Sequence, residues 1–465
     1  MPSTIKKMSV KGFRGFATKQ IFNFSQPTGE PGSGLNIILG PNNSGKSSVV
    51  EALVAITQSE APSFSEGKRN KTAGDRIEIT LTNVDGDGKT VSTIPAGGSQ
   101  TNHPDYAIPP VQGEAFAIYS RRNLPTFFGK SSTNRERYAQ NYQKLQNQRE
   151  VMGGLPGRIF HLYEDEDRLM KFNALLERIL IIKPDWTIEQ SDHGDFYLKF
   201  KSGNNFHSSE GIGEGLLSLF YIVDALYDAT PNSVIIIDEP ELSLHPQFQR
   251  RLRQVFSEYS SDRQIILTTH SPIFIDWNAI ANGAGVIRTV KQKSRISANH
   301  LQQKTRERIA GLISNRNNPH ILGLDASEVF FLEDNVILLE GQEDVLLYPR
   351  VFEKLGITPQ GEFFGWGAGG ADNMTIICSI LNDLGFKKVA GIIDGNRKEN
   401  VGRLQKDFPK YSFFALPADD IRSKKAIVAK PAVKGLLDSD GNIRNEYEED
   451  TQKVLIDVGK YMQKK

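Results

Sequence analysis

One segment constrains the fold of this chain more than any other. The run GPNNSGKS at 40–47 follows the apolar stretch Leu35–Leu39 and precedes residues with helical periodicity. Its glycines allow backbone N–H groups to turn toward an anion, and the N-terminus of the following helix adds a favourable partial charge. A buried strand, a glycine-rich turn and a helix in this order predict a phosphate-binding loop in an α/β domain.

The chemistry of this loop predicts how it would hold ATP with Mg²⁺. Lys46 would reach the β- and γ-phosphates, and the Ser47 hydroxyl would ligate the metal. The predicted nucleotide contacts of the loop are Gly40, Asn42, Asn43, Ser44, Gly45, Lys46, Ser47 and Ser48.

A second apolar run, Val234–Ile237, ends in Asp238 and Glu239. Such a run is typical of a strand buried on both faces, which delivers its two acids to the crevice at the carboxyl end of a parallel sheet. Asp238 is predicted to hold Mg²⁺, directly or through water, and Glu239 to polarise the attacking water as general base. His270 ends the next predicted strand, Gln264–Thr268, and could sense the γ-phosphate.

The Ser- and Gly-rich segment 208–215 opens another predicted helix, which makes it a second candidate anion site. One domain cannot use both sites on one phosphate group. The segment therefore predicts a head-to-tail dimer in which each copy caps the ATP of the other. Its spacing leaves open whether Ser209 and Gly211 or Gly213 and Gly215 face the phosphate.

The phosphate loop, the Ser/Gly segment, the acidic strand and the histidine, in this order, resemble the ATP-binding cassette (ABC) ATPases. The opening Lys11–Phe16 and the absence of long heptad arms look like the subgroup that includes DNA-repair and phage-defence ATPases, rather than transporters. The resemblance also implies a glutamine loop, for which Gln58 is the candidate, with a solvated helix residue as the alternative.

A second α/β pattern begins near residue 336. The apolar strand Val336–Leu339 ends in Glu340, Asp344 follows on the next predicted helix, and the strand 388–393 ends in Asp394. Parallel strands deliver their C-terminal residues to one edge, so these three carboxylates are predicted to converge and bind Mg²⁺ or Mn²⁺. Two such ions would activate water and stabilise the leaving oxygen of a phosphodiester.

This second pattern looks like a Toprim domain, and an ABC ATPase followed by a Toprim domain is the layout of the OLD (overcoming lysogenisation defect) family of ATP-dependent nucleases. The resemblance implies a lysine that aids cleavage, for which Lys424 or Lys425 is the candidate. It also implies Asp-x-Asp after the second strand, where this chain has Asn396. Asparagine still offers a carbonyl oxygen to a metal, but it lowers the charge of the site by one.

The predicted architecture is α/β: an ABC-type P-loop ATPase domain followed by a smaller, Rossmann-like Toprim domain. The expected ranges are 1–320 for the ATPase, with an insertion or helical region at 60–205, then 321–430 for the Toprim domain and 431–465 for a charged tail. The polar stretch 291–318 is the predicted boundary.

The composition narrows the classes of partner that the chain could bind. A net charge of +1 excludes nucleic-acid binding by bulk charge. The single cysteine, Cys378, excludes an internal disulfide and fits the reducing cytoplasm. No run of about 18 apolar residues is present, so a membrane partner is not expected. Candidate basic surfaces, each of which could instead be an ordinary solvated face, are Lys68–Lys71, Arg121–Arg122, Arg135–Arg137 and Lys304–Arg308.

The leading hypothesis is an ATP-regulated, metal-dependent DNA endonuclease that acts in bacterial defence against phage. Its expected partners are DNA, further copies of itself in a dimer, tetramer or larger assembly, and a defence-system protein or nucleic acid. One rival is an ATP-driven sensor or scaffold whose degenerate Toprim domain recruits an effector, which Asn396 favours. A second rival is a DNA-repair ATPase that loads other enzymes.

Overall fold

The computed structural model divides the chain into two compact units, Met1–His300 and Leu301–Lys465. The residues that the structure describes are 4–57, 62–64, 66–74, 76–94, 100–102, 115–120, 122, 128–130, 132–135, 148–180, 184–202, 205–208, 213–293, 295–314, 330–331, 335–364, 367–424 and 432–464.

The first unit is built around a six-stranded sheet in the order β14-β13-β3-β12-β11-β7. The inner strands are parallel, and only the edge strand β14 runs antiparallel to its neighbour. β3, β11 and β12 are buried along their whole length, as their unbroken apolar runs predict. The strands are β3 (Leu35–Leu39), β7 (Ala115–Ile118), β11 (Val234–Asp238), β12 (Gln264–Thr268), β13 (Gly285–Gln292) and β14 (Arg295–His300).

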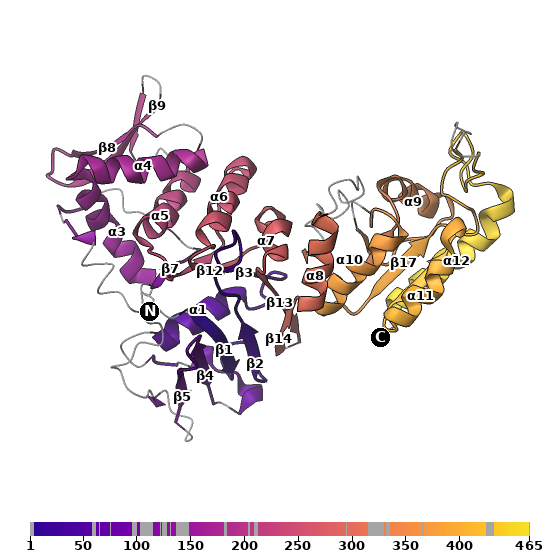
Figure 1. Cartoon of the computed structure of the whole chain (residues 1–465), viewed down its shortest axis with the longest axis horizontal. Coiled ribbons are helices and arrows are strands. Elements are labelled where there is room, and N and C mark those ends of the chain that lie inside the picture. The colour runs from indigo at the N-terminus through magenta and orange to yellow at the C-terminus, as the bar shows by residue number, and fades with distance from the viewer. Residues whose placement is uncertain are drawn as a thin grey trace. The chain divides into compact units, whose positions relative to one another are not determined.

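A second, antiparallel sheet in the order β2-β1-β4-β5-β6 packs against helix α1 (Figure 1). Apolar side chains from β1, β4 and β5 meet those of α1 in one hydrophobic core. This core holds the start of α1, and therefore the turn before it, in place. The elements are α1 (Lys46–Thr57), β1 (Ile5–Lys11), β2 (Gln20–Asn23), β4 (Glu78–Asn83), β5 (Gly88–Thr93) and β6 (Thr101–Asn102), with one-turn 3-10 helices at Glu66–Lys68 and Lys71–Ala73.

Helices α4, α5 and α6 form the upper layer of this unit, below the small sheet β10-β9-β8 (Figure 1). α4 carries an apolar stripe at helical spacing, with Phe172, Leu176 and Ile179 fully buried. The elements are α3 (Gln148–Tyr163), α4 (Glu166–Leu180), α5 (Glu214–Asp228), α6 (Pro246–Tyr259), α7 (Trp277–Ala281), β8 (Trp186–Gln190), β9 (Phe196–Ser202), β10 (Asn205–Ser208) and a 3-10 turn at Pro272–Phe274.

Arg135 does not lie on a basic surface, which was one reading of the sequence. Its side chain is 3% exposed and is bound by Asp224 and Asp228 on α5, at 2.7 Å and 2.9 Å. Arg158, on α3, completes the cluster with a second 2.7 Å contact to Asp224. These four side chains, which we call the buried ion cluster, fasten α3 and the segment around Arg135 to α5.

The second unit is a four-stranded parallel sheet in the order β16-β15-β17-β18. Helices pack on it, including α12, whose Leu455, Val458 and Met462 are buried in the core beside β17 and β18 (Figure 1). The elements are β15 (Val336–Leu339), β16 (Glu362–Phe363), β17 (Val389–Ile393), β18 (Ser412–Ala415), α8 (Gln303–Ser314), α9 (Gln342–Lys354), α10 (Ala371–Asp383), α11 (Glu399–Asp407), α12 (Asn445–Gln463) and a 3-10 turn at Gly395–Arg397.

The division of the chain differs from the expected ranges at both ends of the second unit. It falls at His300 rather than near 320, because α8 packs on α10, where Arg308 Nη1 donates to Ser379 Oγ at 2.7 Å. The expected charged tail contains α12, which is part of the core and not an appendage. Within the described residues, no helix is long and apolar enough to cross a membrane.

Candidate functional site

The turn between β3 and α1 has the backbone of a phosphate-binding loop. Gly40 and Gly45 adopt positive φ angles of 148° and 97°, and Asn43 adopts 60°, which turns successive N–H groups toward the mouth of the loop. Lys46 lies folded over the loop, where its Nζ donates to the carbonyl oxygens of Gly40 at 3.0 Å and Pro41 at 3.1 Å. Burial lowers the pKa of Lys46 to about 8, against the opposing effect of nearby carboxylates.

The acids at the end of β11 face this loop. Ser47 Oγ donates to Asp238 Oδ1 at 3.3 Å, and Thr268 Oγ1, from the end of β12, donates to the same oxygen at 2.5 Å. A hydroxyl beside a buried carboxylate is a donor set of the hard oxygen type that Mg²⁺ takes with a bound nucleotide, so these residues fit that ion. The expected placement of Ser47 beside Asp238 follows from the parallel pairing of β11, β12 and β3.

Glu239 and His270 lie side by side at the ends of β11 and β12. The Nε2 atom of His270 is 3.5 Å from Glu239 Oε1, and this hydrogen bond is the main reason that the pKa of Glu239 lies below its usual range. The carboxyl is therefore ionised at neutral pH, as a general base must be. Glu239 itself has a φ of 51°, a left-handed conformation in which its N–H bonds to Thr268 Oγ1 at 3.2 Å.

Glu241 is a residue of this site that the sequence reasoning did not assign a role. Its Oε1 accepts the backbone N–H of His270 at 2.5 Å, and burial raises the pKa of its carboxyl. Glu241 thus fixes the main chain of the histidine that contacts Glu239. Its position in the run Glu239-Pro240-Glu241 carried no signal of that contact, because His270 lies in a different strand–loop segment.

Arg122 is the second missed residue, since the sequence placed it in a candidate basic surface. Its Nη2 donates to the carbonyl oxygens of Asp238 at 2.6 Å and Glu239 at 3.1 Å, and its Nη1 donates to Ser218 on α5. Burial lowers the pKa of the guanidinium to about 10, although three nearby carboxylates oppose the shift. Arg122 therefore ties helix α5 to the end of the acidic strand.

Three predicted nucleotide contacts, Gln58, Ser209 and Gly211, lie outside the described residues. Gly213 is described and precedes α5 as its N-cap. On the first turn of α5, Glu214 Oε2 accepts a hydrogen bond from Ser243 Oγ at 3.0 Å, which connects the helix start to the segment after the acidic strand.

In the second unit, the carboxyl ends of β15 and β17 bring the predicted acids together. Glu340 Oε1 accepts the backbone N–H of Asp394 at 3.0 Å, and Asp344 caps the start of α9 by accepting the N–H of Gly341 at 2.8 Å. Asp420, beyond β18, is a fourth acid of the same crevice and is 6% exposed. We call Glu340, Asp344, Asp394 and Asp420 the acidic crevice.

The electrostatics show that these four carboxyls influence one another. Burial, followed by the charges of Asp344, Glu340 and Asp420, raises the pKa of Asp394 to about 8. Burial also raises the pKa of Asp344 to about 6 and that of Glu340 above its usual value. Glu340, Asp344 and Asp394, whose raised pKa values oppose ionisation, are oxygen donors of the type that a divalent cation stabilises.

The acidic crevice does not form a finished metal cage. Among the described residues, no three His, Cys, Asp or Glu side chains form a group that could hold a metal ion. Glu340 and Asp344 each accept a backbone N–H in this arrangement. The carboxylates fit Mg²⁺ or Mn²⁺ in donor type and charge. To bind the ion, their side chains would have to move closer together around it.

The two other predicted residues of this site lie at its edge. Asn396 is exposed, in the 3-10 turn Gly395–Arg397 that follows β17. Lys424 Nζ is paired with Asp420 Oδ2, which raises the pKa of the lysine although partial burial acts in the opposite direction. Lys424 therefore carries its positive charge at the crevice, and Lys425 lies outside the described residues.

The phosphate loop, the acidic strand and the histidine, on one parallel sheet, define a P-loop ATPase fold of the ABC type. Two family models match this part of the chain: "AAA domain, putative AbiEii toxin, Type IV TA system" over residues 102–276 and "AAA domain" over residues 7–185. The fold class expected from the sequence is confirmed for this unit.

Curated relatives point to a more particular group. The chain is 29% identical over 160 residues to an OLD nuclease of Thermus scotoductus, which covers 32% of this chain and 29% of that protein. It is 25% identical over 199 residues to Endonuclease GajA of Bacillus cereus, which covers 42% of this chain and 32% of that protein. The match spans about a third of the length of each relative.

Solved structures with a partial likeness are Smc head domains. An Smc head domain bound to the C-terminal domain of ScpA from Pyrococcus furiosus covers 68% of this chain at 14% identity, with a TM-score of 0.42. An SMC head domain from Thermotoga maritima covers 64% at 14% identity, with a TM-score of 0.37. At these scores the likeness has no bearing on function.

Proposed function

We propose that the protein is an ATP-regulated, metal-dependent DNA endonuclease of the OLD type that acts in bacterial defence against phage, in the cytoplasm. The observation that carries the proposal is the acidic crevice, because it lies in the same chain as a P-loop ATPase unit whose curated relatives are named as nucleases. The nuclease names belong to those relatives, so cleavage by this chain is the point to be tested.

In the first unit, each residue has a chemical task that its geometry supports. Lys46 would leave the carbonyl oxygens of its own loop and bind the terminal phosphates of ATP, while Ser47 and Asp238 would hold the Mg²⁺ that accompanies them. Glu239, ionised beside His270, would accept the proton of the attacking water. His270 would contact the γ-phosphate beside Glu239.

The start of α5 supports a head-to-tail dimer as the active arrangement. Gly213 precedes the first turn of the helix, whose N–H groups carry a partial positive charge, and Glu214 is the acidic residue of that turn. Arg122 connects Ser218 of that helix to the carbonyl oxygens of Asp238 and Glu239. Binding of a partner's nucleotide at the start of α5 would therefore be transmitted through Arg122 to the end of β11.

In the second unit, Glu340, Asp344 and Asp394 would hold Mg²⁺ or Mn²⁺, with Asn396 as a neutral oxygen donor. The bound cations would activate water against a phosphodiester and stabilise the leaving oxygen. Lys424, charged beside Asp420, would attract the DNA backbone to the crevice. Asp420 joins the predicted set because its charge contributes to the raised pKa of Asp394.

A plasmid-nicking assay tests the nuclease. Wild-type protein should cut with Mg²⁺ or Mn²⁺, Glu340→Ala should not, and Glu353→Ala, which removes an exposed carboxylate from α9, should cut as wild type does. ATP and a non-hydrolysable analogue are compared in parallel to find the effect of nucleotide on cutting. If pure wild-type protein cuts under none of these conditions, the nuclease proposal fails.

The second candidate is an ATP-driven sensor or scaffold whose second unit recruits an effector. The exposed Asn396, in place of a carboxylate, favours it because it lowers the negative charge available to metals. This candidate predicts no nicking by any variant, together with normal ATP hydrolysis.

A further inference from the structure

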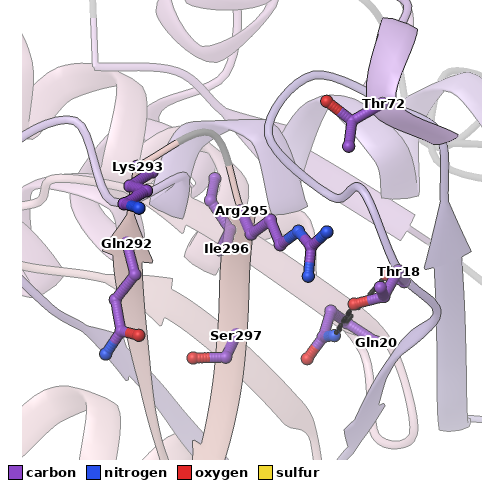
Figure 2. Close-up of a pocket in the computed structure, with 8 residues that line it drawn as sticks. All are labelled: Thr18, Gln20, Thr72, Gln292, Lys293, Arg295, Ile296 and Ser297. Atoms are coloured by element: carbon purple, nitrogen blue, oxygen red, sulfur yellow. Dashed lines mark hydrogen bonds between the residues drawn. The ribbon is translucent and has the colours of Figure 1, made fainter.

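A cavity of about 640 Å³ opens at the tip of the β13–β14 hairpin in the first unit. Gln292 and Lys293 line it from the end of β13, Arg295 and Ser297 from β14, and Gln20 from the start of β2 (Figure 2). We call it the hairpin pocket. Its size falls within the range of about 300–1,000 Å³ that is common for small-ligand sites.

The hairpin pocket has the chemistry of an anion site. Its lining contains Lys293 and Arg295 and, among the described residues, no acidic side chain. Within the described part of the chain, neither cation forms an ion pair with a carboxylate. Arg295 extends across the pocket toward Thr18 and Gln20 (Figure 2). A guanidinium matches the fork of oxygens that a phosphate presents.

Polar side chains around the two cations indicate which kind of anion the pocket fits. The Gln20 amide already donates to Thr18 Oγ1 at 3.0 Å and accepts the N–H of Ala298 at 3.1 Å, so it shapes the wall of the pocket. Gln292 carries an amide that can both donate and accept, and Ser297 carries a hydroxyl. Such groups match the hydroxyls of a sugar and the edge of a base more closely than the uniform surface of an inorganic anion. Charge, polar lining and volume together fit one nucleotide unit.

The hairpin also braces the phosphate-binding loop at two points. Ile296 lies so close to Gly45 and Gly15 that a Cβ on either glycine would come within 2.5 Å or 2.2 Å of its Cδ1 atom. On β13, Thr289 Oγ1 is 2.9 Å from Ser44 Oγ. A ligand that shifts the hairpin tip would therefore move side chains that fill space directly beneath the loop.

We propose that the hairpin pocket binds the phosphate of a nucleotide unit through Lys293 and Arg295, and that this binding regulates the P-loop. The unit could come from a free nucleotide or from a nucleic-acid strand, which share the phosphate and the sugar. The regulatory part rests on the proposed ATP site, whereas binding does not require that the protein cut DNA.

Binding is measured on the full chain in a Lys46→Ala background, which disables the P-loop. One arm titrates AMP by calorimetry, and the other titrates a short fluorescent single-stranded oligonucleotide by anisotropy. We expect Arg295→Gln and Lys293→Gln each to weaken at least one ligand about tenfold, as for loss of a charge-assisted contact. For the oligonucleotide, the slope of log affinity against log salt should fall by about one unit.

Lys291→Gln is the matched control, because it removes one exposed cation from the same hairpin without touching the pocket lining. Its affinity should equal that of the parent. The ligand whose affinity falls in the pocket variants, AMP or the oligonucleotide, identifies the source of the phosphate. If the Lys46→Ala protein binds neither ligand, or if Lys291→Gln weakens binding as much as the pocket variants do, the proposal is overturned.

Regulation is measured in chains with an intact P-loop. The effective ligand should change kcat or KM for ATP about fivefold or more, which is the lower end of common allosteric couplings. Arg295→Gln should hydrolyse ATP at the parental rate without ligand and lose the response to ligand. A wild-type rate that is unchanged by saturating ligand would refute the regulatory part, and absence of all ATP hydrolysis would instead refute the proposed function.

Discussion

Removal of Asp224 should destabilise the first unit more than removal of any exposed acid. Asp224 accepts from Arg135 and Arg158 through its two oxygens, at 2.7 Å each, and all three side chains are at most 6% exposed. Asp224→Ala would remove a carboxylate partner from both buried guanidinium groups, of which Arg135 keeps its contact with Asp228. Breaking a buried ion pair from one side costs about 3–5 kcal/mol, because the remaining charge is desolvated and unpaired.

Urea unfolding followed by tryptophan fluorescence measures this loss. Trp186 is a suitable reporter, since its ring lies 5.2 Å from that of Phe220 on the same helix as Asp224. Glu258→Ala is the matched control: it breaks an ion pair with Arg178 whose side chains are 44% and 57% exposed, and such pairs contribute about 0–1 kcal/mol. If Asp224→Ala costs no more than Glu258→Ala, the buried ion cluster does not hold this unit together as argued.

Three further predictions concern the two sites. Because burial and neighbouring acids raise the pKa of Asp394 to about 8, affinity for Mn²⁺ should rise with pH until that carboxyl is ionised near pH 8. The free energy of unfolding of the metal-free protein should change with pH in the opposite direction. The stability that comes with the raised pKa is present at low pH and is lost as the pH rises through about 8. Asp394→Asn should remove the pH dependence of Mn²⁺ affinity, measured by calorimetry, and that of stability, measured by urea titration. Glu241→Ala should lower kcat for ATP about tenfold with KM unchanged, because the N–H of His270 loses its acceptor, and an unchanged kcat would show that Glu241 does not position the histidine. Gly215→Ala should destabilise the unit by about 1–3 kcal/mol in urea, since its Cβ would lie 2.2 Å from Ser243 O, whereas Gly213→Ala, with open space around it, should not.

The sequence predicted the strands that position the nucleotide site because their signals are local. Leu35–Leu39 and Gln264–Thr268 are observed with the bounds read from their apolar runs. Each run ends where a glycine or a polar motif begins, so both its length and its end were visible. The approach of Ser47 to Asp238 then follows from the parallel order of the strands.

What the sequence did not reveal depends on contacts between distant segments. Arg135 looked like a surface cation because its partner Asp224 is 89 positions away. Asp420 was not among the predicted metal ligands, because its approach to the other acids depends on the pairing of β18 with β17. The β13–β14 hairpin was hidden in a polar stretch, since the exposed ends of its strands mask the buried residues at their centre.

Hydrolysis of ATP by Glu239→Gln protein is the most direct test of the central claim, which is that the first unit binds a triphosphate at the P-loop and uses Glu239 to activate water. The variant should bind ATP as the parent does, while its turnover falls at least about a hundredfold, the usual loss on removal of a general base. Parental turnover by Glu239→Gln would contradict the account, because a neutral amide cannot accept the proton.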